Sequence, residues 1–105
     1  MVEQRDIDII FRNPINWERF RNKTILVTGA TGRLGMYIVE ALIKADIDWN
    51  LSLNILALAR DEKKLRQLLG NSLELPNVHI LVQDITEPIQ WKTDIHYIFH
   101  TAGAA

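Results

Sequence analysis

The sequence has no cysteine among its 105 residues. This absence excludes a disulfide framework and a thiolate zinc site, and it is typical of proteins from a reducing compartment. No apolar run approaches the roughly 18 residues that a membrane-spanning helix needs. The amino-terminal stretch MVEQRDID is acidic, whereas a signal peptide begins with basic residues. We therefore expect a cytoplasmic protein without a membrane segment.

Charge of one sign is equally scarce. The chain has 12 Lys and Arg against 13 Asp and Glu, for a net charge of -1, and no run of five or six like charges. Nucleic-acid surfaces are basic, so the sequence favours a small molecule or another protein as partner. The length is that of one domain. We expect a single domain over 1–105, with a helical lead-in at 1–21 and a core at 22–105.

The first half of the chain alternates between the patterns of helices and strands. Asn13 and Pro14 suit the start of a short helix over 13–20. The run KTILVT at 23–28 predicts a strand buried on both faces. A helix follows, and 46–50 is expected to be a loop. The apolar stripe of that helix is predicted at Leu34, Ile38, Ala41, Leu42 and Ala45.

The second half continues the alternation. A strand is predicted at 51–59, then a helix that Asp61 caps and Gly70 ends. Further strands are predicted at 78–82 and 95–102, and Pro88 argues against a long helix between them. Strands joined by helical crossovers form parallel sheets with right-handed connections. We expect an α/β fold, a doubly wound Rossmann-like sheet of strand order 3-2-1-4 with helices on its faces.

Glycine is also sparse, yet three of the five glycines stand three residues apart in TGATGRLG, at Gly29, Gly32 and Gly35. Such glycines can simply permit a sharp turn between a strand and a helix. Their place directly after a buried strand and before a helix is instead typical of a dinucleotide-binding turn, in which backbone amides and the helix dipole hold a diphosphate. The stretch lacks the GK[ST] ending of a nucleoside-triphosphate loop.

Three motifs in order resemble the NAD-dependent epimerase/dehydratase family, the extended branch of the short-chain dehydrogenases/reductases. TGATGRLG resembles the family's TGxxGxxG turn, QDIT its adenine-side segment, and IFHTAGAA the HxA segment that closes its fourth strand. The resemblance covers about residues 22–105. It implies a nicotinamide dinucleotide as cofactor, a nucleotide sugar as substrate and His100 on the cofactor side. The predicted cofactor-binding residues, from these motifs and from the end of the second strand, are Gly29, Thr31, Gly32, Arg33, Leu34, Gly35, Arg60, Asp61, Asp84, Ile85, Thr101, Ala102 and Gly103.

The family's catalytic YxxxK pair is missing. Tyr37 and Tyr97 are the only tyrosines, and the residues four positions later are Ala41 and Thr101. We assign no catalytic residue and interpret the chain as the amino-terminal NAD(P)-binding part of a nucleotide-sugar epimerase/dehydratase. Two alternatives are a non-catalytic NAD(P)-binding module that senses or scaffolds, and an inactive truncated fragment. An open fourth-strand edge would favour a homodimer.

The choice between NAD and NADP depends on the carboxyl end of the second strand. An acidic residue there binds the ribose hydroxyls of NAD, and an arginine accommodates the 2′-phosphate of NADP. Asp48 has the right spacing from the glycines but precedes the strand. Arg60 follows the strand and favours NADP, whereas Asp61 would serve NAD unless it caps its own helix.

His96 and His100 do not predict a metal site. On a strand, four residues separate two side chains by roughly 13 Å, too far to share an ion. The three tryptophans lack the basic surroundings of a nucleic-acid platform. We expect neither a metal nor a nucleic acid as partner.

Overall fold

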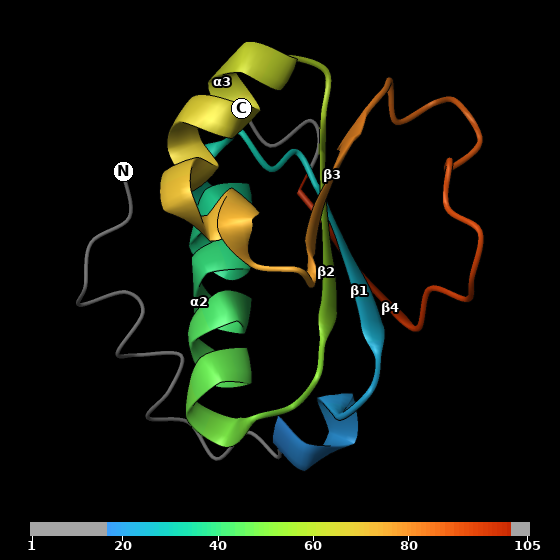
Figure 1. Ribbon diagram of the computed structural model, residues 1–105. Helices are drawn as coiled ribbons and strands as arrows, with labels where there is room; N and C mark the ends of the chain where they lie inside the picture. The colour runs from blue at the N-terminus through green and yellow to red at the C-terminus, as the bar shows by residue number, and fades with distance from the viewer. Residues whose placement is uncertain (1–16, 102–105) are drawn as a thin grey trace.

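The fold is described from a computed structural model, which defines residues 17–101. The elements in chain order are η1 (Trp17–Phe20), β1 (Thr24–Thr28), α2 (Arg33–Trp49), β2 (Asn54–Ala59), α3 (Glu62–Leu69), η2 (Gly70–Glu74), β3 (Val78–Val82) and β4 (Tyr97–His100). Figure 1 shows the four strands as one sheet, with α2 and α3 beside it.

All strand pairs are parallel, and the sheet order is β3-β2-β1-β4. In register, Leu26 of β1 lies opposite Leu56 of β2 and Ile98 of β4. The predicted α/β fold with strand order 3-2-1-4 is confirmed. Because the strands are parallel, their carboxyl ends meet at one edge of the sheet, where the connections after β1, β2 and β3 begin.

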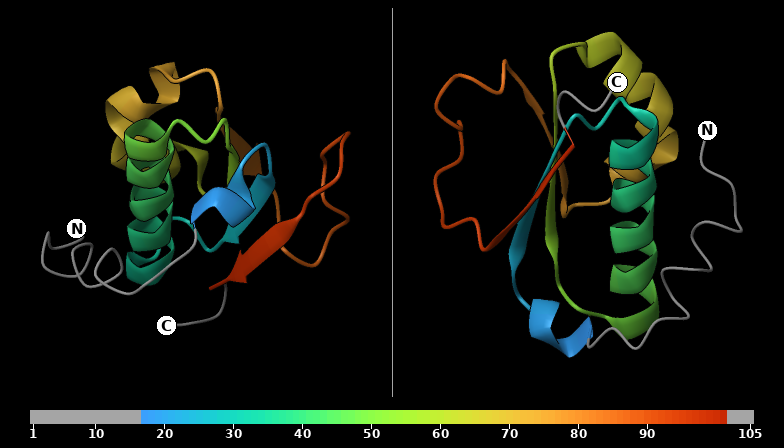
Figure 2. Two further views of the ribbon diagram at one scale, coloured as in Figure 1. Left: turned by 90° about the horizontal axis from the view of Figure 1, so that it is seen from below. Right: turned by 180° about the vertical axis from the view of Figure 1, so that it is seen from behind.

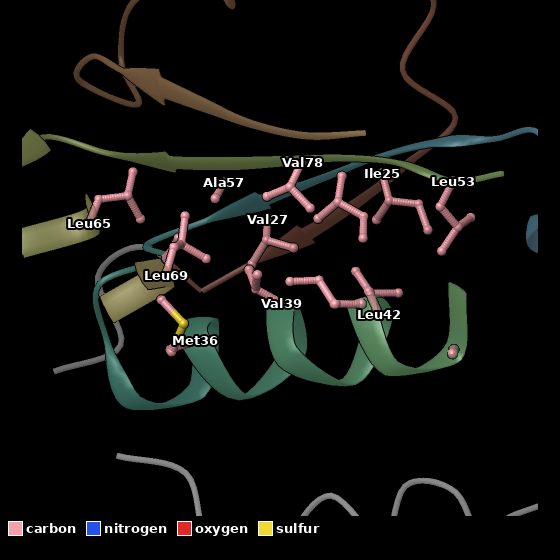
Figure 3. Packing of buried hydrophobic residues seen from close by; sticks show 14 of the residues in the cluster. Ile25, Val27, Met36, Val39, Leu42, Leu53, Ala57, Leu65, Leu69 and Val78 are labelled. Carbon is pink, nitrogen blue, oxygen red and sulfur yellow. The ribbon is translucent and has the colours of Figure 1, made fainter. Parts of the chain in front are cut away.

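The helices cover one face of the sheet. Met36, Val39 and Leu42 of α2 point toward Ile25 and Val27 of β1 (Figure 3). Leu65 and Leu69 of α3 complete this layer beside β2 and β3. Burying a side chain of this size stabilises a fold by about 1.5–3 kcal/mol. The alternation of side chains along each strand sends the neighbouring residues to the opposite face.

That opposite face is covered by a loop. Leu26, Leu56, Leu58 and Leu81 form its buried layer. The connection between β3 and β4 crosses this face, as both views show (Figures 1 and 2). Its apolar side chains are Ile85, Ile89, Trp91 and Ile95. Within residues 17–101, the helices therefore cover one face of the sheet and the loop covers the other. On the loop-covered face, the loop with Pro88 and its apolar side chains packs where a helix could have packed. The chain still passes over both sides of the sheet.

Helix α2 differs from the prediction in two ways. It runs through the predicted loop at 46–50 and ends at Trp49, with Asn50 in the left-handed conformation at φ 51°. Its buried side also differs, since Leu34 is 51% exposed while Met36 and Val39 are buried. The helix is apolar on several sides, so the contacts of Gly35 and the sheet, rather than periodicity, decide which side faces inward.

The other boundaries agree more closely with the sequence. Asp61 caps α3 by accepting the Lys64 N–H at 3.0 Å, and Gly70 ends it at φ 52°. The predicted strands at 51–59 and 95–102 are shorter than expected, although Leu51 and Leu53 before β2 are fully buried. Of the helix predicted at 13–20, only the 3-10 turn η1 lies within the described residues.

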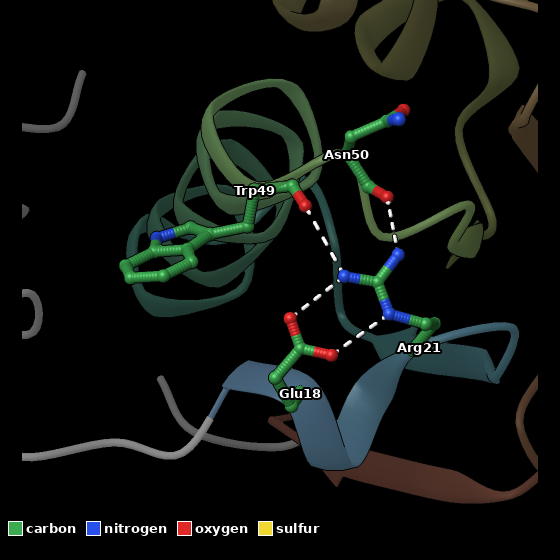
Figure 4. A network of polar contacts seen from close by, with 4 residues as sticks. All are labelled: Glu18, Arg21, Trp49 and Asn50. Carbon is green, nitrogen blue, oxygen red and sulfur yellow. Dashed lines mark hydrogen bonds and ion pairs between the residues drawn. The ribbon is translucent and has the colours of Figure 1, made fainter.

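An arginine joins η1 to the end of α2. Arg21 donates to both carboxylate oxygens of Glu18 at 2.8 and 2.7 Å, and to the Asn50 carbonyl at 2.8 Å (Figure 4). The Arg21 hydrogen bonds lower the pKa of the Glu18 carboxyl, and Glu18 raises the pKa of the arginine. A cation at this position also complements the negative end of the helix dipole.

Candidate functional site

A pocket of about 320 Å³ opens where the carboxyl ends of three neighbouring strands meet. Each strand contributes the residues at or just after its end. The lining residues are Gly29 and Thr31 after β1, Leu58, Ala59 and Arg60 at β2, and Gln83, Asp84 and Ile85 after β3. Five of the predicted cofactor-binding residues are thus brought together, although 56 positions separate the first from the last in the sequence.

The glycine turn forms one wall of this pocket. Gly29 adopts φ 64°, a conformation that favours glycine, and its carbonyl accepts the Gly32 N–H at 2.9 Å. The Ala30 N–H donates to Leu58 of β2 at 3.0 Å. Helix α2 begins directly after Gly32. The Met36 N–H donates to the Gly32 carbonyl at 3.0 Å. The N–H groups before Met36, in the first turn of the helix, have no acceptor within the helix itself.

Gly35 brings α2 into direct contact with the turn. A Cβ atom on Gly35 would overlap the carbonyl oxygen of Gly29 and would lie 2.8 Å from its carbon. At Gly32 the corresponding distance to the Gly29 oxygen is 3.2 Å. The helix start therefore lies against the turn only because Gly35 has no side chain. Arg33 and Leu34, on the same turn of α2, are exposed beside it.

Two charged residues follow β2 and differ in their contacts. Arg60 is exposed and lines the pocket, and it also lines an adjoining hollow together with Thr31 and Lys64. Asp61 lines only that hollow, and its carboxylate accepts the Lys64 N–H as the cap of α3. The structure thus places the arginine, and not the aspartate, at the wall of the main pocket.

Asp84 forms a tight turn on the far wall. Its Oδ1 accepts the Thr86 N–H at 2.9 Å and the Thr86 hydroxyl at 2.8 Å. These hydrogen bonds, with a smaller electrostatic contribution from Arg60, lower the pKa of the Asp84 carboxyl. Asp84 therefore stays ionised to lower pH than an ordinary aspartate. Ile85 lines the pocket and also packs on the loop-covered face of the sheet.

Gln83 is a pocket residue that the sequence reasoning missed. It is 9% exposed, and its side chain spans the loop that follows β3. Nε2 donates to the Pro88 carbonyl at 3.0 Å, and Oε1 accepts the Gln90 N–H at 3.1 Å. Its place directly after β3 is a sequence signal that Gln83 lies at this edge of the sheet, but it does not indicate the bonds with Pro88 and Gln90.

The end of β4 contacts the turn rather than the pocket. Thr101 is 9% exposed, and its hydroxyl donates to the Thr28 carbonyl and lies 3.3 Å from the Gly29 carbonyl oxygen. Its N–H donates to Thr28 Oγ1 at 3.0 Å. His100 Nδ1 lies 3.0 Å from the same Thr28 oxygen. The predicted site residues Ala102 and Gly103 lie outside the described residues.

His96, just before β4, and His100, at its end, contact opposite ends of β1. His96 Nδ1 accepts the Thr24 N–H at 3.0 Å, whereas His100 contacts Thr28. Between residues 17 and 101, no three metal-ligating side chains gather into a possible ion site. Over the same range, every helix is too short or too polar to cross a bilayer.

Comparison with known proteins agrees with this architecture. The sequence profile of the NmrA-like family matches residues 21–104. The chain is 30% identical over 87 residues to a UDP-glucose 4-epimerase of Rickettsia bellii (strain OSU 85-389), an alignment that covers 80% of this chain and 25% of that protein. It thus spans about a quarter of this curated relative. No solved structure matches significantly. The resemblance found in the motifs is confirmed: the chain belongs to the NmrA-like family of NAD(P)-binding proteins, which is related to the epimerases and dehydratases.

Proposed function

We propose that this chain is the NAD(P)-binding part of an oxidoreductase of the epimerase/dehydratase type that acts on nucleotide sugars. The pocket at the carboxyl ends of β1, β2 and β3, continuous with the glycine turn, is the observation that supports it most strongly. Ligands of open α/β sheets bind at this edge. The sugar-nucleotide part of the proposal is supported by the motifs and by the similarity to the Rickettsia protein.

Different residues would contact different parts of the cofactor. The diphosphate would lie against Gly29, Thr31, Gly32 and the first-turn amides of α2, where the helix dipole favours an anion. The adenosine would occupy the pocket between Arg60 and the Asp84 and Ile85 wall. The nicotinamide would lie toward β4, where the motif resemblance places Ala102 and Gly103. When bound, the nicotinamide supplies hydride transfer, and the residues of this chain bind and orient it.

Titration of the chain with NAD+ and NADP+ by calorimetry tests this function. We expect saturable binding of at least one dinucleotide, and no turnover of UDP-glucose by this chain, since no tyrosine here is followed four residues later by lysine. Asp48→Asn, at the far end of α2, is a control variant that should bind as the parent does. If neither dinucleotide saturates the chain at millimolar concentration, the proposal is wrong. Reduction of bound cofactor by UDP-glucose would instead contradict our prediction that this chain, without a YxxxK pair, does not turn over that substrate.

We also infer a preference for NADP. Arg60 and Thr31 line the pocket, and the adjoining hollow, which both also line, adds Lys64 near the position expected for the ribose 2′ group. The Asp61 carboxylate is engaged as the cap of α3. A guanidinium binds phosphate through charge-assisted hydrogen bonds, whereas NAD recognition requires an acceptor for the ribose hydroxyls.

Replacing Arg60 by alanine should weaken NADP+ binding by roughly 10- to 150-fold, because one charge-assisted phosphate contact contributes about 1.5–3 kcal/mol. The affinity for NAD+ should change by less than about threefold. Calorimetry of both cofactors measures the difference. Lys63→Ala is the matched control, since Lys63 lines neither the main pocket nor the adjoining hollow. Equal losses for both cofactors would contradict the NADP assignment, and so would tighter NAD+ binding by the parent chain.

A further inference from the structure

The conformation of Gly29 depends on the two peptide groups that flank it. Their carbonyl oxygens belong to Thr28 and Gly29, and one side chain contacts both. The Thr101 hydroxyl donates to the Thr28 carbonyl and lies 3.3 Å from the Gly29 carbonyl oxygen. Because glycine has no Cβ to limit its φ and ψ, such contacts decide how well a turn at glycine is ordered.

The same hydroxyl also lies at the junction of three elements. It comes from the end of β4, it contacts the turn that follows β1, and it would lie 2.9 Å from a Cβ on Gly35 of α2. The Thr101 N–H adds a bond to Thr28 Oγ1 at 3.0 Å, which keeps the side chain in place. Thr101 is buried and does not line the pocket.

We propose that Thr101 is a positioning residue for the diphosphate-binding turn, acting through the backbone of Thr28 and Gly29 rather than on the cofactor. This inference rests on the proposed NAD(P) function for its consequence in binding. The Gly29 carbonyl also accepts the Gly32 N–H, so its orientation sets where the turn meets the start of α2. A turn that is already ordered before binding loses less entropy when the diphosphate arrives.

Three substitutions separate the hydroxyl from the rest of the side chain. Thr101→Val keeps the shape and removes the hydroxyl, Thr101→Ser keeps the hydroxyl, and Thr101→Ala removes both the hydroxyl and the methyl group. Thr24→Val is the matched control, because it makes the same change in a buried threonine at the opposite end of β1. Each variant is titrated with NAD+ and NADP+, and its unfolding by urea is measured in parallel.

We expect Thr101→Val to weaken cofactor binding roughly 3- to 10-fold, the size of one neutral hydrogen bond. Thr101→Ser should bind within about twofold of the parent, and so should Thr24→Val. A loss below about threefold in Thr101→Val, or one explained by its unfolded fraction, overturns the proposal. If Thr101→Val is too unstable to titrate, serine and alanine are compared, and equal affinities of those two overturn it.

The free protein provides a readout that needs no cofactor. With only five glycines in the sequence, three of them in the turn, the Gly29, Gly32 and Gly35 amides are convenient NMR probes. Thr101→Val should shift Gly29 and Gly32, Thr101→Ser should restore them, and Thr24→Val should leave them unchanged. Unshifted glycines in Thr101→Val overturn the positioning role. If the parent chain binds neither cofactor, the proposed function fails, and this measurement still decides the role of Thr101.

Discussion

Alanine in place of Gly35 should lower the free energy of unfolding by about 3 kcal/mol or more, the upper range for added atoms in a packed interior. A glycine-to-alanine change inside an exposed helix ordinarily stabilises it by about 1 kcal/mol. The sign reverses here because the new Cβ would overlap the Gly29 carbonyl and would lie 2.9 Å from Thr101 Oγ1. Both neighbours belong to a turn and a strand end that have little room to move.

Urea unfolding followed by circular dichroism measures this change. Gly32→Ala is the informative control, since its Cβ would lie 3.2 Å from the same oxygen and its φ of -77° suits any residue. We expect its cost to be less than half that of Gly35→Ala. Cofactor binding by Gly35→Ala should be lost along with stability, because α2 and the turn are pushed apart. A Gly35→Ala chain as stable as the parent would show that the helix can move away without cost.

Removing the carboxylate of Asp46 should be the second largest change, costing about 2–4 kcal/mol. Its Oδ1 accepts the Leu53 N–H at 2.9 Å, and its Oδ2 accepts the Asn77 amide at 2.7 Å. Asn77 in turn donates to the Leu53 carbonyl at 2.7 Å. One half-buried side chain therefore connects the end of α2 to the segments that enter β2 and β3. In Asp46→Ala, these donors lose a charged acceptor at a site with limited access to water.

The neighbouring Asp48 supplies the control for this prediction. It lies two residues further along α2, and its side chain is 47% exposed in an ion pair with Lys44 at 2.8 Å. Exposed pairs of this spacing contribute about 0.3–0.5 kcal/mol, so Asp48→Ala should be close to neutral. Urea midpoints of the two variants give the comparison. Similar midpoints would mean that the Asp46 bonds are replaced by water at no cost.

Much of the fold could be predicted because its strands are buried on both faces and its turns carry their own signals. Residues 24–28 are all buried, so β1 is a continuous apolar run in the sequence. Asp61 and Gly70 bound α3 through capping chemistry that is local to the chain. Local sequence signals do not predict a helix boundary that depends on contacts with distant residues. The stretch DIDWN at 46–50 is expected from the sequence to be a loop, yet the bonds of Asp46 to Leu53 and Asn77 hold the last turn of α2 in place.

Some residues of the candidate site could likewise be predicted from the sequence, and others could not. Arg60, Asp84 and Ile85 could be predicted to share a pocket because each follows a strand at the same edge of a parallel sheet. Nothing in the local sequence indicates that the Gln83 side chain turns into the loop and bonds with Pro88 and Gln90. The inward orientation of the Thr101 hydroxyl was equally hidden, since it depends on a contact with a strand more than 70 residues earlier.

That distance along the chain also sets an order of assembly. The cost of closing a loop grows with its length, and pairings between distant residues form more slowly than near ones. β1 and β2 are joined through α2 alone, whereas β4 reaches β1 across 72 residues, as in the contact between Thr28 and His100. We therefore expect β4 to dock during folding after the β1–β2 pair has formed. The glycine turn would then gain its Thr101 contact only when β4 pairs with β1, so the turn that we propose to bind the diphosphate would be completed in that step.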